Sequence, residues 1–260
     1  ILEGGSRLTG RPAYRDHALA LYALLDKLRA QFPHLEIESC SSGGGRIDLG
    51  IMAHCQRVWG SDCIDPLERQ GIHRGELLLL PPEVIGSHVA STTSHTTGRA
   101  HSIDYRAITA LFQHMGIEWD LRKATPTEKE RLAAWIKVYK EHRGLLHSGK
   151  TVRADYPDAA LSCRGVVGNG QAIFELSCTS TSASAPFAPL TLPGLAPEGE
   201  YEVRLLGPTQ TVFDLRSAPA WWPPEGEAVA IPGAVLCQVG LPIPTLIPES
   251  ALLLQVSKKN

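Results

Sequence analysis

The chain has 260 residues, of which 43% are hydrophobic and 20% charged, so it can bury a sizeable core and does not have the composition of a disordered chain. Its formal net charge of −2 gives no electrostatic reason to expect nucleic acid or an anionic membrane as a partner. The apolar run at residues 77–80 stops at Pro81 and Pro82, far short of the roughly 20 residues of a membrane-spanning helix. We therefore expect a soluble globular protein.

The first part of the chain alternates predicted helices and strands. Apolar residues at helical spacing predict a helix over 12–32, ended by Pro33. Residues 35–40 alternate like a short strand, which runs into three glycines and then a helix-like segment at 47–56. A strand at 58–61 and a helix at 66–79, with Pro66 in its first turn, complete two such pairs.

The alternation continues to about residue 142. We expect a strand at 84–89, a helix at 103–114, a strand at 116–121, and a helix that Thr125 and Glu128 open with a capping box. Strands that alternate with helices indicate parallel β/α units, and four units are half of an eight-unit barrel. We therefore predict that residues 1–147 are the C-terminal half of a (β/α)8 barrel. The edges of a half-barrel must be covered, which suggests that the other half lies upstream of Ile1.

The composition changes after Gly149. Short apolar runs are separated there by clusters of Gly, Pro and Ser, which is typical of antiparallel β structure. The predicted strands are residues 172–176, 201–206, 235–239 and 252–256, and residues 177–186 are expected to be a loop. The predicted fold class is thus α/β followed by all-β, with residues 148–260 forming a small antiparallel β-sandwich domain.

Cysteine and histidine usage gives two further expectations. The six cysteines show no C-x-x-C spacing and no dense disulfide pattern, which favours a reduced, cytoplasmic setting. The ten histidines form neither H-x-x-x-H nor H-E-x-x-H, so we predict no metal.

Two segments that follow predicted strands are candidate sites, because active sites of β/α barrels lie where the strands end. The three glycines at 43–45 let a backbone approach a ligand closely, but neither a Walker A nor a dinucleotide-binding pattern is present, and from the residues alone a flexible structural turn is the favoured explanation. Asp62, after the next strand, is either the N-cap of the following helix or a general acid at the barrel mouth. Composition and spacing leave both alternatives open.

The sequence of these two segments resembles the family 36 α-galactosidases of the glycoside hydrolases. The motifs ESCSSGGGRIDLG at 38–50 and VWGSDCIDPLER at 58–69 occur in the order and at the interval of that family. The resemblance continues through GSHV at 86–89, SHTTGR at 94–99 and GIEWDL at 116–121, and it extends only loosely into the β-rich part. It implies hydrolysis, with retention, of terminal α-linked galactose from oligosaccharides such as melibiose and raffinose, without a cofactor.

The resemblance also assigns roles residue by residue. Asp62 becomes the acid/base, while Cys40 and the backbone of Gly43, with Gly44 beside it, contact the 2-hydroxyl side of the sugar. Trp59 is expected to pack beneath the site and Arg46 to hold the loop through carboxylates such as Asp48. Asp65 and Glu68 are interpreted as structural. Members of this family typically form oligomers, so a homo-oligomer is possible for the full-length protein.

The nucleophile that the resemblance implies is absent from this sequence. The family places it in a lysine-x-aspartate-x-asparagine motif on the strand before the first helix seen here, and no such motif occurs among the 260 residues. Residues 1–8 also depart from the sequence expected just after that motif. We therefore expect a truncated chain that is inactive alone. The alternatives are a noncatalytic carbohydrate-binding or structural fragment and a galactosyl-transferring relative of raffinose-synthase type.

The β-rich part carries one more candidate, the aromatic pair Trp221 and Trp222 followed by two prolines. Aromatic faces pack on pyranose rings, which suggests sugar stacking. Paired aromatics beside prolines also anchor loops, and we favour this structural role.

Overall fold

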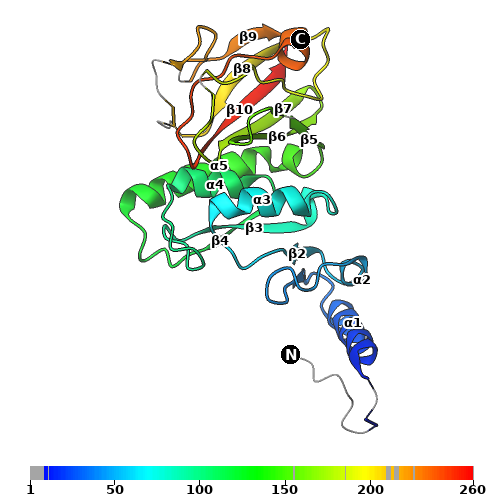
Figure 1. Cartoon of the computed structure of the whole chain (residues 1–260). Helices are drawn as coiled ribbons and strands as arrows, with labels where there is room; N and C mark the ends of the chain where they lie inside the picture. Colours follow the sequence, from blue (N-terminus) through cyan, green and yellow to red (C-terminus); the bar gives the residue numbers. More distant parts are fainter. Residues whose placement is uncertain are drawn as a thin grey trace. The chain divides into compact units, whose positions relative to one another are not determined.

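The structure is a computed structural model that divides into two compact units, residues 1–62 and 63–260, and each is described by itself (Figure 1). The described residues are 9–10, 12–154, 156–184, 186–208, 212–213, 217–224 and 226–259. Residues 1–8, whose departure from the family pattern was noted above, lie outside them. Within these ranges, no helix combines the length and apolar character needed to cross a membrane.

The first unit contains two β/α pairs with a small core. Helix α1 (Tyr14–Gln31) confirms the first predicted helix, and strands β1 (Glu38–Ser39) and β2 (Arg57–Trp59) pair in parallel. Helix α2 (Leu49–Met52) is shorter than predicted, and Gly50 within it is a poor helix former. Leu25, Ile51 and Cys55 form the buried core of this unit.

The second unit begins with two further helix–strand pairs. Helix α3 (Pro66–Glu76) and the 3-10 turn η1 (Pro82–Val84) precede strand β3 (Ile85–Ala90), while helix α4 (Ile103–Leu111) precedes strand β4 (His114–Glu118). β3 and β4 pair in parallel from Gly86–His114 to Ala90–Glu118. Helix α5 (Pro126–Leu146) starts with the predicted capping box, since Thr125 and Glu128 bond each other's backbone N–H.

A six-stranded antiparallel sheet follows. Its strands are β5 (Lys150–Ala154), β6 (Leu161–Gly168), β7 (Gln171–Cys178), β8 (Glu200–Leu206), β9 (Val229–Pro232) and β10 (Ser250–Lys258). The spatial order is β5-β6-β7-β10-β8-β9, so the last strand lies in the middle of the sheet. Between β6 and β7, Asn169 and Gly170 both have positive φ, which matches the twist of a tight hairpin.

Both faces of this sheet are buried. Alternate side chains of β7 point in opposite directions, so Ile173 packs toward α4 and α5, where Ile108 and Trp135 lie, while Phe174 packs on the other side. Glu175 also points toward the helices and receives hydrogen bonds from Gln70 of α3 and Arg164 of β6. The α/β part of the second unit and the sheet therefore share one core.

The structure differs from the sequence-based prediction in three respects. Residues Val235–Val239, predicted as a strand, form a π-helix, and β5, β6 and β9 were not predicted. The predicted sandwich is not confirmed: in the described part of the chain, the layer opposite α4 and α5 consists of the π-helix and loop residues such as Phe187, Leu190 and Leu241. An α/β part with parallel strands followed by an antiparallel sheet is confirmed. The half-barrel and the domain boundary after residue 147 stay predictions.

Candidate active site

The two predicted site segments lie side by side in the first unit. β1 ends at Ser39 and is followed by the loop 40–46, while β2 ends at Trp59 and is followed by residues 60–62. Because the strands are parallel, both loops leave the sheet at the same edge. All the predicted site residues, Cys40, Gly43, Gly44, Arg46, Trp59 and Asp62, belong to these segments.

The glycines of the first loop allow it to touch the second. Gly43 is buried with φ +71°, and a Cβ built on it would lie 2.8 Å from the Cα of Ser61 and 2.9 Å from the backbone N of Asp62. A Cβ on Gly44 would lie 2.5 Å from the carbonyl oxygen of Gly60. Side chains at these positions would push the loops apart. The glycines thus have a structural role that also sets the surroundings of Asp62.

Trp59 orients the carboxylate of Asp62. The indole is buried, with 6% of its surface exposed, and its Nε1–H donates a 3.0 Å hydrogen bond to Oδ1 of Asp62. The Asp62 residue itself is exposed. A carboxylate held at the end of a parallel strand and open to solvent has the placement that a general acid requires.

The structural alternative for Asp62 was to be the N-cap of the following helix. In the structure, Asp65 makes this cap. Oδ1 of Asp65 accepts hydrogen bonds from the backbone N–H groups of Leu67, at 2.9 Å, and Glu68, at 3.4 Å. The sequence held a signal for this, because an aspartate directly before a proline at the first helical position is a common helix start. Capping therefore does not account for Asp62.

The other predicted residues are placed as follows. Cys40 is exposed on the first loop. Arg46 donates to Oγ of Ser41 in this loop at 3.4 Å, and not to Asp48 as expected. The carboxylate of Asp48 is used locally, since its Oδ1 caps α2 by accepting from the N–H of Ile51 at 2.8 Å. Among the described residues, no group of three or more His, Cys, Asp or Glu side chains is arranged to hold a metal ion.

The aromatic pair of the second unit is engaged in packing. Nε1 of Trp221 donates to the carbonyl oxygen of Pro242 at 2.7 Å, and the ring of Trp222 contacts those of Trp221 and Phe213 edge-on. Trp222 lines an apolar cavity of about 460 Å³ together with residues of β8 and β10. These contacts favour the loop-anchoring role over sugar stacking.

Comparison with known proteins agrees with this geometry. The Melibiase family matches residues 4–149. The α-galactosidase of Escherichia coli is 39% identical over 257 residues, which are 96% of this chain and 36% of that protein. The α-galactosidase AgaA of Geobacillus stearothermophilus is 32% identical over 194 residues, covering 74% of this chain and 27% of AgaA.

Solved structures give the same result. The family 36 α-galactosidase AgaA of Geobacillus stearothermophilus superimposes with a TM-score of 0.84 at 27% identity, over 100% of this chain and 34% of AgaA. Another AgaA structure, of a variant in complex with raffinose, has a TM-score of 0.84 at 26% identity, over the same shares of both chains. The relatives and structures named here are glycoside hydrolases that carry the name α-galactosidase. The chain belongs to the Melibiase family, and it spans about a third of the length of these relatives.

Proposed function

We propose that this chain supplies the acid/base part of a retaining α-galactosidase. The observation that carries the proposal is the exposed Asp62 carboxylate, held by Trp59 at the end of a parallel strand in a segment that the Melibiase match includes. In the first step Asp62 gives its proton to the glycosidic oxygen as the bond to galactose breaks. In the second step Asp62 takes a proton from the water that attacks the anomeric carbon.

The remaining loop residues then form part of the galactose pocket. Cys40 and the backbone of Gly43 face the 2-hydroxyl side of the sugar, where hydrogen bonds strengthen as the transition state gains oxocarbenium character. Gly44 keeps this loop against Gly60, while Arg46 fixes its conformation through Ser41. The reaction needs no cofactor.

A retaining glycosidase needs a second carboxylate, about 5 to 5.5 Å from the first, as nucleophile. We propose that this group comes from a polypeptide segment outside the 260 residues, because the sequence has no lysine-x-aspartate-x-asparagine motif and the relatives are about three times as long. The present chain would then be the C-terminal part of the enzyme, consisting of the second half of its (β/α)8 barrel and the β domain. The whole enzyme would cleave terminal α-linked galactose from sugars such as melibiose and raffinose.

The test compares the 260-residue chain with the polypeptide encoded by its complete reading frame, both assayed with melibiose, whose sugar leaving group must be protonated. We expect no appreciable activity from the 260 residues alone and activity from the complete polypeptide that Asp62→Asn lowers by about 10²- to 10⁴-fold. The matched control is Asp26→Asn, which changes an exposed aspartate paired with His54 in the same unit and should leave activity unchanged. Full activity of the Asp62→Asn enzyme would refute the acid/base role, and activity of the short chain would refute the external nucleophile.

The same assay separates the two rival functions. A complete polypeptide that binds galactosides without cleaving them is a carbohydrate-binding protein. Product analysis in the presence of sucrose or raffinose distinguishes transfer of galactose to a sugar from transfer to water.

A further inference from the structure

Glu249, the residue directly before β10, has a backbone conformation that is unusual for its residue type. Its φ is +57°, in the left-handed region, and among the described residues only Ser42 and Asn169 share this property without being glycine. Asn169 lies in the tight turn between β6 and β7, where asparagine is common. For a glutamate this conformation is strained, and such strain persists only where other contacts hold the residue in place.

The side chain of Glu249 makes a contact of this kind with a buried histidine. Nε2–H of His101 donates to Oε2 of Glu249 at 3.0 Å, since a carboxylate only accepts. The His101 side chain is 2% exposed and that of Glu249 is 44% exposed. The histidine end of the hydrogen bond is therefore shielded from water, which strengthens a bond to a charged acceptor.

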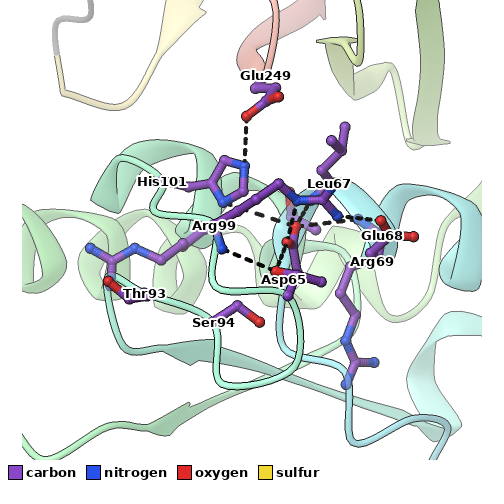
Figure 2. A network of polar contacts seen from close by, with 12 residues as sticks. Asp65, Leu67, Glu68, Arg69, Thr93, Ser94, Arg99, His101 and Glu249 are labelled. Atoms are coloured by element: carbon purple, nitrogen blue, oxygen red, sulfur yellow. Dashed lines mark hydrogen bonds and ion pairs between the residues drawn. The ribbon is translucent and has the colours of Figure 1, made fainter.

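The other side of the His101 ring faces Asp65, as Figure 2 shows. Nδ1 of His101 lies 3.9 Å from Oδ1 of Asp65, within electrostatic contact but beyond a hydrogen bond. Asp65 is completely buried and accepts hydrogen bonds from Thr97 and from Nε of Arg99 at 2.7 Å. Burial acts to raise the pKa of this carboxyl, but the hydrogen bonds from Thr97, Arg99 and the backbone of Leu67 hold the pKa below its ordinary value.

Further contacts fix His101 within the α/β part of the second unit. Its backbone N–H donates to the carbonyl oxygen of Thr92 at 3.1 Å, in the same loop after β3. Its ring centre lies 5.6 Å from that of Tyr105, which is buried on α4. His101 is thus held by the loop after β3 and by α4, while Glu249 belongs to the chain that enters the antiparallel sheet.

The strand that follows Glu249 joins two groups of strands. β10 is the last strand in sequence, yet it pairs with β7 on one side and with β8 on the other. In the order β5-β6-β7-β10-β8-β9, the strands β7 and β8 are neighbours of β10 and not of each other. A contact that fixes the start of β10 therefore bears on both groups.

We propose that His101 and Glu249 form a clasp between the loop after β3, residues 91–102, and the start of β10, and that this clasp maintains the left-handed backbone of Glu249. It links two positions that are 148 residues apart in the sequence. Opening of the chain at either end of the clasp therefore frees the other end. The clasp lies entirely within the second unit and does not depend on the function proposed above.

Hydrogen–deuterium exchange of the complete polypeptide, read by mass spectrometry, tests the clasp because it reports local opening segment by segment. Glu249→Gln keeps the shape of the side chain and removes its charge. We expect it to speed exchange about 3-fold both at residues 246–252 and in the loop 91–102, because a charged acceptor is replaced by a neutral one. The hairpin of β5 and β6 should exchange as before.

Glu249→Gly separates the clasp from a purely local backbone effect. Glycine adopts a positive φ without strain, so a local effect predicts unchanged or slower exchange. Loss of the clasp predicts exchange about 10-fold faster in both segments, in spite of the relieved strain. The matched control is Asn169→Gly, at φ +51°, which should change exchange in its own hairpin less than about 2-fold.

A double variant tests whether the two residues act together. When Glu249→Gln is added to His101→Leu, we expect no further increase in exchange, because the contact is already lost. Additive effects, faster exchange at 246–252 alone, or unchanged exchange in Glu249→Gly would each overturn the clasp. Should His101→Leu fail to fold, the two Glu249 variants still decide, since they change a partly exposed side chain.

Discussion

Asp62 and Asp65 lie three residues apart, yet the structure treats them in opposite ways. Asp62 ends the first unit as an exposed carboxylate with one indole donor, next to loops that only glycine allows to approach each other. Asp65 belongs to the second unit, is fully buried, and is surrounded by donors from α3 and the loop after β3. The comparison teaches that an aspartate is available for chemistry where the fold gives it no structural task.

The largest expected contrast is in stability. Asp65→Ala removes a helix cap and leaves the groups around it without their buried partner, so we expect it to lower the free energy of unfolding by about 3 kcal/mol. Asp62→Ala removes an exposed side chain and should change the free energy of unfolding by less than about 0.5 kcal/mol. Urea unfolding of both variants measures the difference. Equal destabilisation by the two substitutions would contradict the structural difference between Asp62 and Asp65.

Glu76 has a second buried carboxyl group, and it extends the comparison of Asp62 with Asp65. Glu76, at the end of α3, has its pKa raised to about 7 by burial, although Arg69 and Arg164 act in the opposite direction. Glu76 therefore binds a proton more tightly in the folded protein than in the unfolded chain. As pH rises from about 4.5 to 7, this group lowers the free energy of unfolding, by at most about 3 kcal/mol. Below 4.5 and above 7 its contribution is constant.

Glu76→Gln should remove this pH dependence and make the protein more stable at pH 8. Urea titrations at pH 5 and pH 8, with Glu198→Gln at an exposed position as the surface control, measure the change. An identical pH dependence in the wild type and the Glu76 variant would contradict the assignment.

The glycine contacts give a smaller effect. Gly43→Ala adds a Cβ 2.8 Å from the Cα of Ser61 at a positive φ, so we expect about 2 kcal/mol of destabilisation and a loss of activity in the complete polypeptide. Gly10→Ala is the control, because φ is also positive there, +64°, but among the described residues no atom lies within 4 Å of the added Cβ. Thermal unfolding should then show a clearly larger shift for Gly43→Ala than for Gly10→Ala.

The smallest effect concerns the orientation of Asp62. Trp59→Phe keeps an aromatic ring in the core but removes the hydrogen bond to Asp62, and we expect kcat/KM for melibiose to fall about 10-fold, or about 1.4 kcal/mol of transition-state stabilisation. The value for α-galactosyl fluoride, whose leaving group needs little protonation, should change much less. Equal losses for both substrates would show that Trp59 serves the pocket as a whole and not the acid.

The sequence by itself determined the features that depend on neighbouring residues. The helical spacing around Leu25, the capping box of Thr125 and Glu128, and the two motifs on either side of residue 50 predicted α1, the start of α5 and the candidate site segments. Propensity, capping and motif spacing are local, and so can be seen in one stretch of chain.

Only the tertiary structure decided what depends on contacts between distant segments. It showed that Asp65 and not Asp62 caps α3, that Gly43 packs against Ser61, and that Val235–Val239 coil into a π-helix over the sheet. A short apolar run is compatible with a strand or a helix until its packing partners are known, and a carboxylate is compatible with several roles until its donors are known. Those partners come from other parts of the chain, and folding is what brings them together.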